Sequence, residues 1–228
     1  LVLEAGQGQI GTEAKRVWVN LTGANANITA RAQGDVWLGK TQGDMRIATI
    51  YSQSGDVDIW AKAGSVLDAL NADFVNIEAN DIRMRASGSI GSASNAFDIE
   101  ARGNGSAAGN GWVTAFAGSD VVLTEAFGDL WVRNIYAGGD VTLISAISMF
   151  DAIDVTTASD PLSGDNAITT ATPLADITGN NITLRARLGF VGAAGNELDL
   201  NLAAGGDGIL NATSAKHMYL TETTGDLF

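Results

Sequence analysis

The sequence predicts an all-β protein built as a β-solenoid of about ten stacked coils. Three observations lead to this fold class: long internal repeats, a short turn-and-strand unit within each repeat, and almost no window suited to an amphipathic helix, the best being residues 61–71. At about 20 to 25 residues per coil, the 228 residues fill about ten coils. At about 4.8 Å per coil, the rod would be about 50 Å long.

The long repeat becomes visible when two segments are placed in register. Residues 82–99 match residues 182–200 after one inserted residue, and the start of the chain supplies a third, shorter copy. The period is marked by Ile10, Ile90 and Val191, so it is 80 residues and then 101. A second motif follows each copy, and its three examples begin at Trp37, Val122 and Tyr219. Because the period varies, insertions are expected in loops while the strand pattern is kept.

A shorter unit recurs inside the long repeat. Each unit has a Gly-Asp or Asp turn signal followed by four or five residues that alternate between core and surface character. Six of these units begin at Gly34, Gly43, Gly55, Asp120, Gly128 and Gly139. Glycine permits positive φ at a corner, and aspartate can bond the backbone there. The alternation with period two predicts a strand in each unit.

The drifting repeat length separates a solenoid from other all-β folds. A closed propeller tolerates such drift poorly, and the tight hairpin signals of a sandwich are nearly absent. Residues 1–228 are therefore interpreted as one solenoid segment of a longer repetitive protein. Residues 156–177 contain both prolines and the weakest alternation, so they are predicted to form a loop excursion.

Composition and charge exclude several functional classes. The net charge is −13, with 13 basic against 26 acidic residues, which disfavours a nucleic-acid partner. Apolar runs are too short for a membrane-spanning helix. With no cysteine and one histidine, thiolate metal sites, Fe–S clusters and most histidine metal sites are excluded. No cofactor is expected.

The candidate catalytic and metal-binding residues each have a simpler interpretation. His217 is expected on the outer face, with Met218 and Leu220 pointing inward. The carboxylates of Asp56 with Asp58, and of Asp98 with Glu100, could form acid/base pairs of the kind found in β-helical polysaccharide enzymes. A solvated outer face is the favoured interpretation, and the chain is predicted not to be an enzyme. Four corner aspartates could bind an occasional calcium ion, but bonding to backbone amides is the favoured interpretation: Asp44, Asp56, Asp129 and Asp140.

Residues 88–99, 189–200 and 219–227 resemble the repeats of large bacterial surface proteins, the filamentous-haemagglutinin-like adhesins. The resemblance covers most of the chain, apart from residues 156–177. It implies a right-handed parallel β-helix, export from the cell, and a role in adhesion or in a cell-surface fibre. It implies no catalytic residues.

Aromatic residues are predicted to lie on the outer surface. Trp18, Trp37, Trp60 and Trp131 each alternate with the aliphatic residues of their predicted strands, and Tyr219 aligns with Trp37. If the aliphatic side chains face the core, these rings face outward. Two interpretations remain open. Loops 101–111 or 156–177 cover the rings, or the rings form a lateral contact stripe for subunit packing or for stacking on sugars.

Two functional hypotheses follow from these observations. The first is a non-enzymatic extracellular solenoid segment, either an adhesin stalk or a surface-fibre subunit. The alternative is a carbohydrate-binding or polysaccharide-degrading β-helix domain, which a lateral cluster of Asp, Arg and Lys would favour. The expected partners are flanking repeats or identical subunits end to end, with surface carbohydrate as a further candidate. The expected location is the cell surface.

Overall fold

The computed structural model of the protein describes residues 1–23, 25–71, 74–103, 110–152, 175–202 and 208–223. Every regular element in these ranges is a β-strand, and no helix in them could cross a membrane. Sheet A contains β1 (Val2–Ala5), β3 (Ile28–Ala32), β5 (Met45–Ser52), β7 (Val66–Asp68), β8 (Ile77–Ala79), β10 (Phe97–Ala101), β12 (Val121–Glu125), β14 (Val141–Ser145), β17 (Ile182–Ala186) and β19 (Leu210–Ser214). Sheet B contains β2 (Val17–Val19), β4 (Val36–Lys40), β6 (Val57–Ala61), β9 (Ile82–Ala86), β11 (Trp112–Ala117), β13 (Leu130–Ala137), β15 (Met149–Asp151), β16 (Ile177–Gly179), β18 (Leu198–Leu202) and β20 (Leu220–Glu222).

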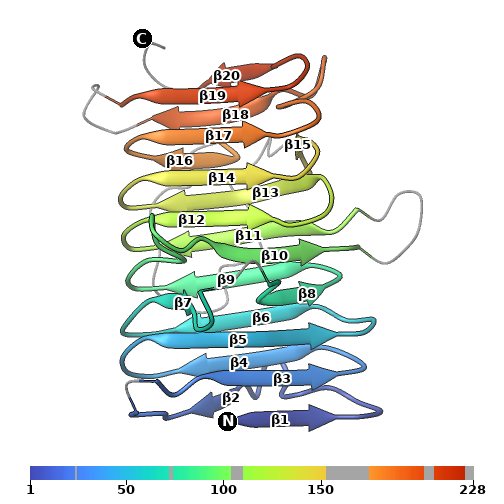
Figure 1. Ribbon diagram of the computed structural model, residues 1–228, viewed down its shortest axis with the longest axis vertical. Helices are drawn as coiled ribbons and strands as arrows, with labels where there is room; N and C mark the ends of the chain where they lie inside the picture. Colours follow the sequence, from blue (N-terminus) through green and yellow to red (C-terminus); the bar gives the residue numbers. More distant parts are fainter. Residues whose placement is uncertain (24, 72–73, 104–109, 153–174, 203–207, 224–228) are drawn as a thin grey trace.

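The strands form two parallel sheets that rise together from β1 to β20 (Figure 1). The chain crosses from one sheet to the other and back as it rises. All pairings between named strands are parallel. Each sheet follows a path of nine hydrogen-bonded strands, with one further strand beside the path. The all-β, parallel-strand prediction is confirmed, and the nine rungs agree with the expected ten coils to within one. The arrangement is consistent with a parallel β-helix.

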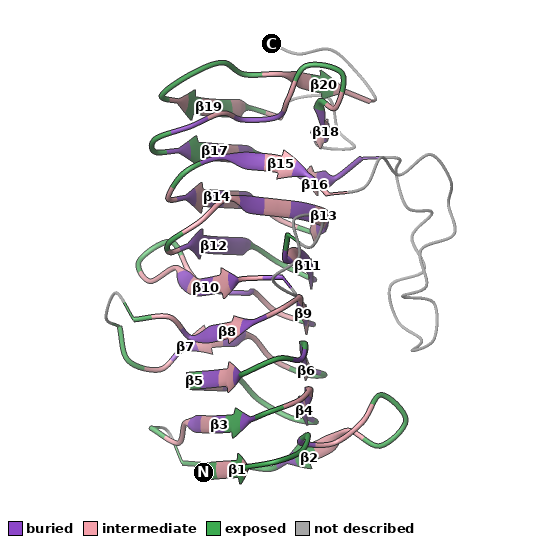
Figure 2. Ribbon diagram, turned by 90° about the vertical axis from the view of Figure 1, so that its right-hand side faces the viewer, coloured by how far each residue is buried: buried purple, intermediate pink, exposed green. Residues whose placement is uncertain are grey.

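The core is a stack of aliphatic side chains between the sheets. One inward column of sheet B runs through Leu38, Ile59, Met84, Ala115 and Ile135, which pair in register on successive strands and are fully buried. Burial of one such large apolar side chain contributes about 1.5 to 3 kcal/mol. Figure 2 shows that buried positions continue through the middle strands, whereas the first and last strands are more exposed.

Two rungs are each made by two short strands. In sheet A, β7 and β8 both pair with β5, and in sheet B, β15 and β16 both pair with β13. The predicted excursion 156–177 therefore falls between two strands of one rung, and most of it lies outside the described residues. Ile177, placed in that excursion by the sequence, instead begins β16 and is fully buried. The error arose because a three-residue strand is too short to produce a clear alternation.

The long repeat of the sequence corresponds to a repeated corner. The markers Ile10, Ile90 and Val191 are buried, and each precedes a glycine with φ between +70° and +72°. The carbonyl groups of the three markers accept backbone N–H bonds from the first residues of the second motif, Trp37, Val122 and Tyr219, at 2.7, 2.8 and 2.8 Å. After each glycine, a four-residue turn closes with reciprocal backbone bonds, at residues 12–15, 92–95 and 193–196. The repeat therefore encodes one corner geometry used three times.

Gly91→Ala is expected to destabilise the protein strongly. Gly91 has a φ of +70°, and an added Cβ would lie 2.2 Å from the carbonyl oxygen of Val122 in the next rung. An L side chain at this φ and a clash with backbone together cost on the order of 3 kcal/mol. Thermal denaturation should show the melting temperature lowered by about 10 °C. Gly128→Ala is the control, since no atom lies within 4 Å of its added Cβ. Equal melting of the two variants would contradict the corner assignment.

Candidate functional site

All five tryptophans of the chain lie on strands of sheet B: Trp18 on β2, Trp37 on β4, Trp60 on β6, Trp112 on β11 and Trp131 on β13. Their aliphatic neighbours point into the core, so the rings point outward. Trp18 is 42% exposed and the other four rings are half-buried. We call this outward side of sheet B, from β2 to β13, the tryptophan face. The predicted outward orientation of the four named tryptophans is correct.

Three of the rings gather at the N-terminal end of this face. The rings of Trp18 and Trp60 lie two rungs apart in the sheet, yet their centroids are 5.6 Å apart. Gly39 is the residue between them in the same column, and its missing side chain leaves room for the Trp18 ring. The Trp37 ring lies in the neighbouring column, with the Arg16 guanidinium 5.4 Å from its centroid.

Gly39→Ala is expected to displace the Trp18 ring. An added Cβ would lie 2.4 Å from a ring carbon of Trp18 and 2.7 Å from Cδ of Arg16. Because these are side-chain atoms that can shift, the expected cost is about 1 to 2 kcal/mol. Tryptophan fluorescence should change as the Trp18–Trp60 contact is lost. In a Trp18→Ala background the same substitution should cost clearly less, and an equal cost in both backgrounds would contradict the account.

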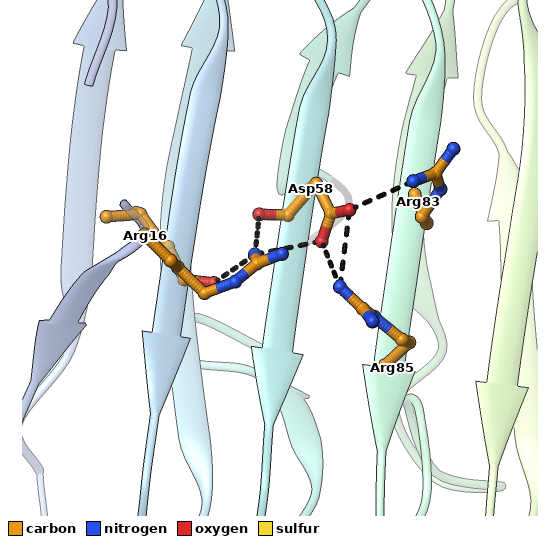
Figure 3. A network of polar contacts seen from close by, with 5 residues as sticks. Arg16, Asp58, Arg83 and Arg85 are labelled. Carbon is orange, nitrogen blue, oxygen red and sulfur yellow. Dashed lines mark hydrogen bonds and ion pairs between the residues drawn. The ribbon is translucent and has the colours of Figure 1, made fainter. Parts of the chain in front are cut away.

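A network of charges lies beside these rings (Figure 3). The carboxylate of Asp58 on β6 accepts ion pairs from Arg16 at 2.8 Å, Arg85 at 3.2 Å and Arg83 at 3.4 Å. Arg16 also donates to the backbone carbonyls of Leu38 and Asp58. The Asp58 side chain is 3% exposed and that of Arg16 is 5% exposed. The expectation that Asp58 lies on a solvated face with Asp56 is therefore wrong, because arginines from β9 and from before β2 cover it.

Cations also lie over the aromatic rings. The Nζ of Lys62 is 4.3 Å from the Trp60 centroid and 4.8 Å from that of Trp18, so one exposed lysine touches both. Arg85 lies 4.6 Å from the Trp60 centroid. Such contacts contribute about 0.5 to 2 kcal/mol each. The rings are thus partly covered by cations and by one another.

A second aromatic cluster lies further along the face. Trp112 and Trp131 are register neighbours, and the Trp131 ring lies 4.9 Å from that of Phe150 on β15. Arg133 lies 4.1 Å from the Trp112 centroid. Sequence reasoning did not select Trp112 or Phe150, although Trp112 precedes Val113 in the same alternation that placed Trp37 outside. The predicted single stripe is therefore two clusters separated by the arginines of β9.

Tyr219 is not part of either cluster. It precedes β20 at the far end of sheet B, where its ring lies 6.3 Å from that of His217. The alternative that loops 101–111 and 156–177 cover the rings falls mainly on residues outside the described ranges.

Cations gather beside the rings of the tryptophan face, although the whole chain is acidic. On the outward positions of β2, β4, β6, β9, β11 and β13, Asp58 is the one acidic residue. Arg16, Arg83 and Arg85 pair with it, and Lys62 and Arg133 lie over the rings of Trp60 and Trp112. Four aspartates adjoin the face at corners that precede its strands: Asp35, Asp56, Asp81 and Asp129. Burial is the main cause that raises the pKa of Asp56, and burial raises the pKa of Asp81 to about 6. The cations therefore lie beside the rings, and most of the carboxyl groups lie at the corners.

The corner aspartates bond backbone amides, as the sequence predicted. The oxygens of Asp44, Asp56, Asp129 and Asp140 accept N–H bonds from Ser65, Asp81, Ser148 and Asn181 at 2.9, 3.2, 2.9 and 3.1 Å. Each bond joins one rung to the next. Within the described ranges, no group of three acidic or histidine side chains is arranged to hold a metal ion.

The structure brings together two carboxyl pairs that sequence reasoning missed. Glu125 on β12 meets Glu100 on β10, and burial with this neighbour raises the pKa of Glu125 to about 9. Asp176 meets Asp151 across the interrupted rung, and burial with this neighbour raises the pKa of Asp176 to about 8. The two carboxyl groups of the first pair lie about one coil apart in the sequence, and those of the second pair flank the excursion. No local spacing in the sequence therefore indicates either pair. Asp98 and Glu100, the predicted pair, are both half-buried on sheet A.

The remaining predicted and observed sites are simpler. His217 is exposed, as expected, but Met218 is 47% exposed and not buried, because no described rung follows it. A pocket of about 250 Å³ lies away from the tryptophan face. It is lined by Arg46, Leu67, Asp68, Asn71, Ser92 and Asn95.

Comparison of the chain with protein-family models, with curated proteins and with solved structures finds no match.

Proposed function

We propose that this chain is a structural and adhesive segment of an extracellular, right-handed β-solenoid. The observation that carries the proposal is the unbroken parallel pairing of both sheets around one aliphatic core. In such a stack each rung buries its inner side against its neighbours, so length can grow by repetition with few demands on the surface.

The terminal rungs offer surfaces for end-to-end association. Inward-facing Leu3, Leu210 and Leu220 are only partly buried, whereas equivalent residues in the middle rungs are fully buried. Strand β1 at one end and strand β19 at the other each pair with one strand in the path. An identical subunit stacked end to end would complete both the pairing and the burial.

The surface location and the adhesive role rest on the character of the repeats. The repeated corner at Gly11, Gly91 and Gly192 is the structural form of the motif that resembles filamentous-haemagglutinin-like adhesins. An acidic, cysteine-free rod fits a surface fibre, because like charge keeps neighbouring rods apart.

Negative-stain electron microscopy and small-angle scattering test the proposal. We expect rods of one width, about 43 Å long for nine rungs, that join end to end as concentration rises. A permanently monomeric segment that gains no stability when flanking coils are added would contradict it.

A second function, polysaccharide binding, is favoured by the tryptophan face. A lateral cluster of Asp, Arg and Lys was the feature expected of a carbohydrate-binding β-helix, and Asp58 with its arginines and Lys62 provides it beside stacked rings. Binding fits better than cleavage here. Glycoside hydrolysis needs two carboxyl groups, and Asp58 is the one acidic residue on the outward positions of β2, β4, β6, β9, β11 and β13.

Retention of the protein on polysaccharide-coated beads tests this second function. We expect retention on some coatings and no release of reducing ends from any of them. Release of reducing ends by the purified segment would contradict the preference for binding.

A further inference from the structure

We propose that the tryptophan face binds a linear, uronic-acid-containing polysaccharide that lies along the axis of the stack. This inference rests on the second function proposed above and names its ligand class.

The local charge of the tryptophan face favours an anionic ligand. The chain carries a net charge of −13, yet at the N-terminal end of this face four cationic groups, Arg16, Lys62, Arg83 and Arg85, lie beside one outward carboxylate. Three of them, Arg16, Arg83 and Arg85, share that one carboxylate. Such a concentration of positive charge attracts an anion to this face and to few other places on an acidic molecule.

The direction in which the outward side chains are arranged favours a linear ligand. Trp18, Gly39, Trp60 and Arg85 occupy one column on successive rungs, and the next residue of the column, Phe116, is buried. Successive rungs are about 4.8 Å apart, so the column runs parallel to the stack. Two rings and then a cation therefore follow one another along a line, and Lys62 lies over both rings. A polymer whose flat sugar faces alternate with carboxylates matches this order, because sugar faces stack on indole rings and carboxylates pair with guanidinium groups.

The cationic side chains of this face favour a carboxylate as the anion. Arg85 already donates to both oxygens of the Asp58 carboxylate, at 3.2 and 3.4 Å. Arg85 is therefore occupied, and Arg83, which is 24% exposed and 3.4 Å from Asp58, is the arginine of β9 that can also reach a ligand carboxylate. Lys62 is exposed and lies between two rings, where it can pair with a second carboxylate next to a stacked sugar.

Binding of a defined oligogalacturonate tests the proposal, measured by calorimetry and by tryptophan fluorescence. A neutral galacto-oligosaccharide of equal length, a sulfated oligosaccharide of equal charge and a single-stranded oligonucleotide serve as comparison probes. We expect the oligogalacturonate to bind most tightly and its affinity to fall as salt rises. Lys62→Ala combined with Arg83→Ala should weaken it at least tenfold. Arg185→Ala, which removes an exposed cation from sheet A, should leave it unchanged.

Each other outcome is decisive. Equal binding of the neutral probe would overturn the anionic ligand but keep polysaccharide binding. Tighter binding of the sulfated probe or the oligonucleotide would overturn the uronic-acid assignment. Equal weakening by Arg185→Ala would overturn the site. Binding of none of the probes would overturn the inference, and the rod proposal would still stand or fall on the microscopy above. Circular dichroism of each variant separates lost binding from lost folding.

Discussion

Asp58→Ala is expected to destabilise the protein by about 3 to 5 kcal/mol, which is the usual cost of removing one partner from a buried ion pair. The Arg16 guanidinium, 5% exposed, would lose its carboxylate partner while it remained enclosed by β2, β4 and β6. Arg83 and Arg85 would face each other without the anion between them. Urea denaturation should show a lower midpoint with an unchanged slope.

The control for this prediction is Glu4→Ala, which removes the same charge from an exposed, outward position on β1. Its free energy of unfolding should stay within about 0.5 kcal/mol of the wild type. If Asp58→Ala behaves like Glu4→Ala, the network in Figure 3 does not stabilise the fold.

Stability is expected to fall as pH rises from about 5 to about 9. The folded protein raises the pKa of Asp176 to about 8 and that of Glu125 to about 9, mainly through burial. Between the unfolded and folded pKa values, the folded state holds protons that the unfolded state has released. The stabilisation is therefore complete at low pH and is lost as pH rises through the folded values. The loss should be on the order of several kcal/mol, measured by melting at pH 5, 7 and 9.

The chain contains its own control for the Asp151–Asp176 pair. At the equivalent place in the other interrupted rung, Asn76 donates to Asp68 at 2.7 Å and accepts from the N–H of Asp98 at 2.9 Å. Asp176 likewise accepts from the N–H of Asp199, at 2.8 Å. An amide at position 176 can thus keep both bonds without a shared proton.

Asp176→Asn should therefore raise stability at pH 9 and flatten the pH dependence. The reverse substitution, Asn76→Asp, should introduce alkaline sensitivity at the other rung. An unchanged pH dependence in both variants would show that these rungs do not control it.

The fold could be predicted from the sequence because its determinants are local and repeated. Alternation of residues such as Val36, Trp37 and Leu38 fixes which side chains face the core, and the corner glycines mark each return of the chain. What the alternation could not reveal is which strands share a rung. The positions of β7 with β8, and of β15 with β16, depend on pairing with β5 and β13 across insertions.

The candidate site was predictable only in part, for the same physical reason. Outward orientation is a property of one strand, so Trp18, Trp37, Trp60 and Trp131 were placed correctly. The partners of Asp58 come from two other coils, and no spacing along one strand indicates them. The spacing of Asp56 and Asp58 suggested a carboxylate pair, but Asp56 bonds the next corner while Asp58 is enclosed by arginines.

The central claim is tested most directly by measuring polysaccharide binding and the melting temperature of one double variant. This variant, Trp18→Ala with Trp131→Ala, removes a ring from each cluster. If the tryptophan face is a recognition surface on a stack that folds without it, binding to oligogalacturonate should fall at least tenfold. The melting temperature should drop by no more than about 5 °C. Loss of the folded state together with binding would show that the rings are structural, and binding at wild-type strength would show that they recognise nothing.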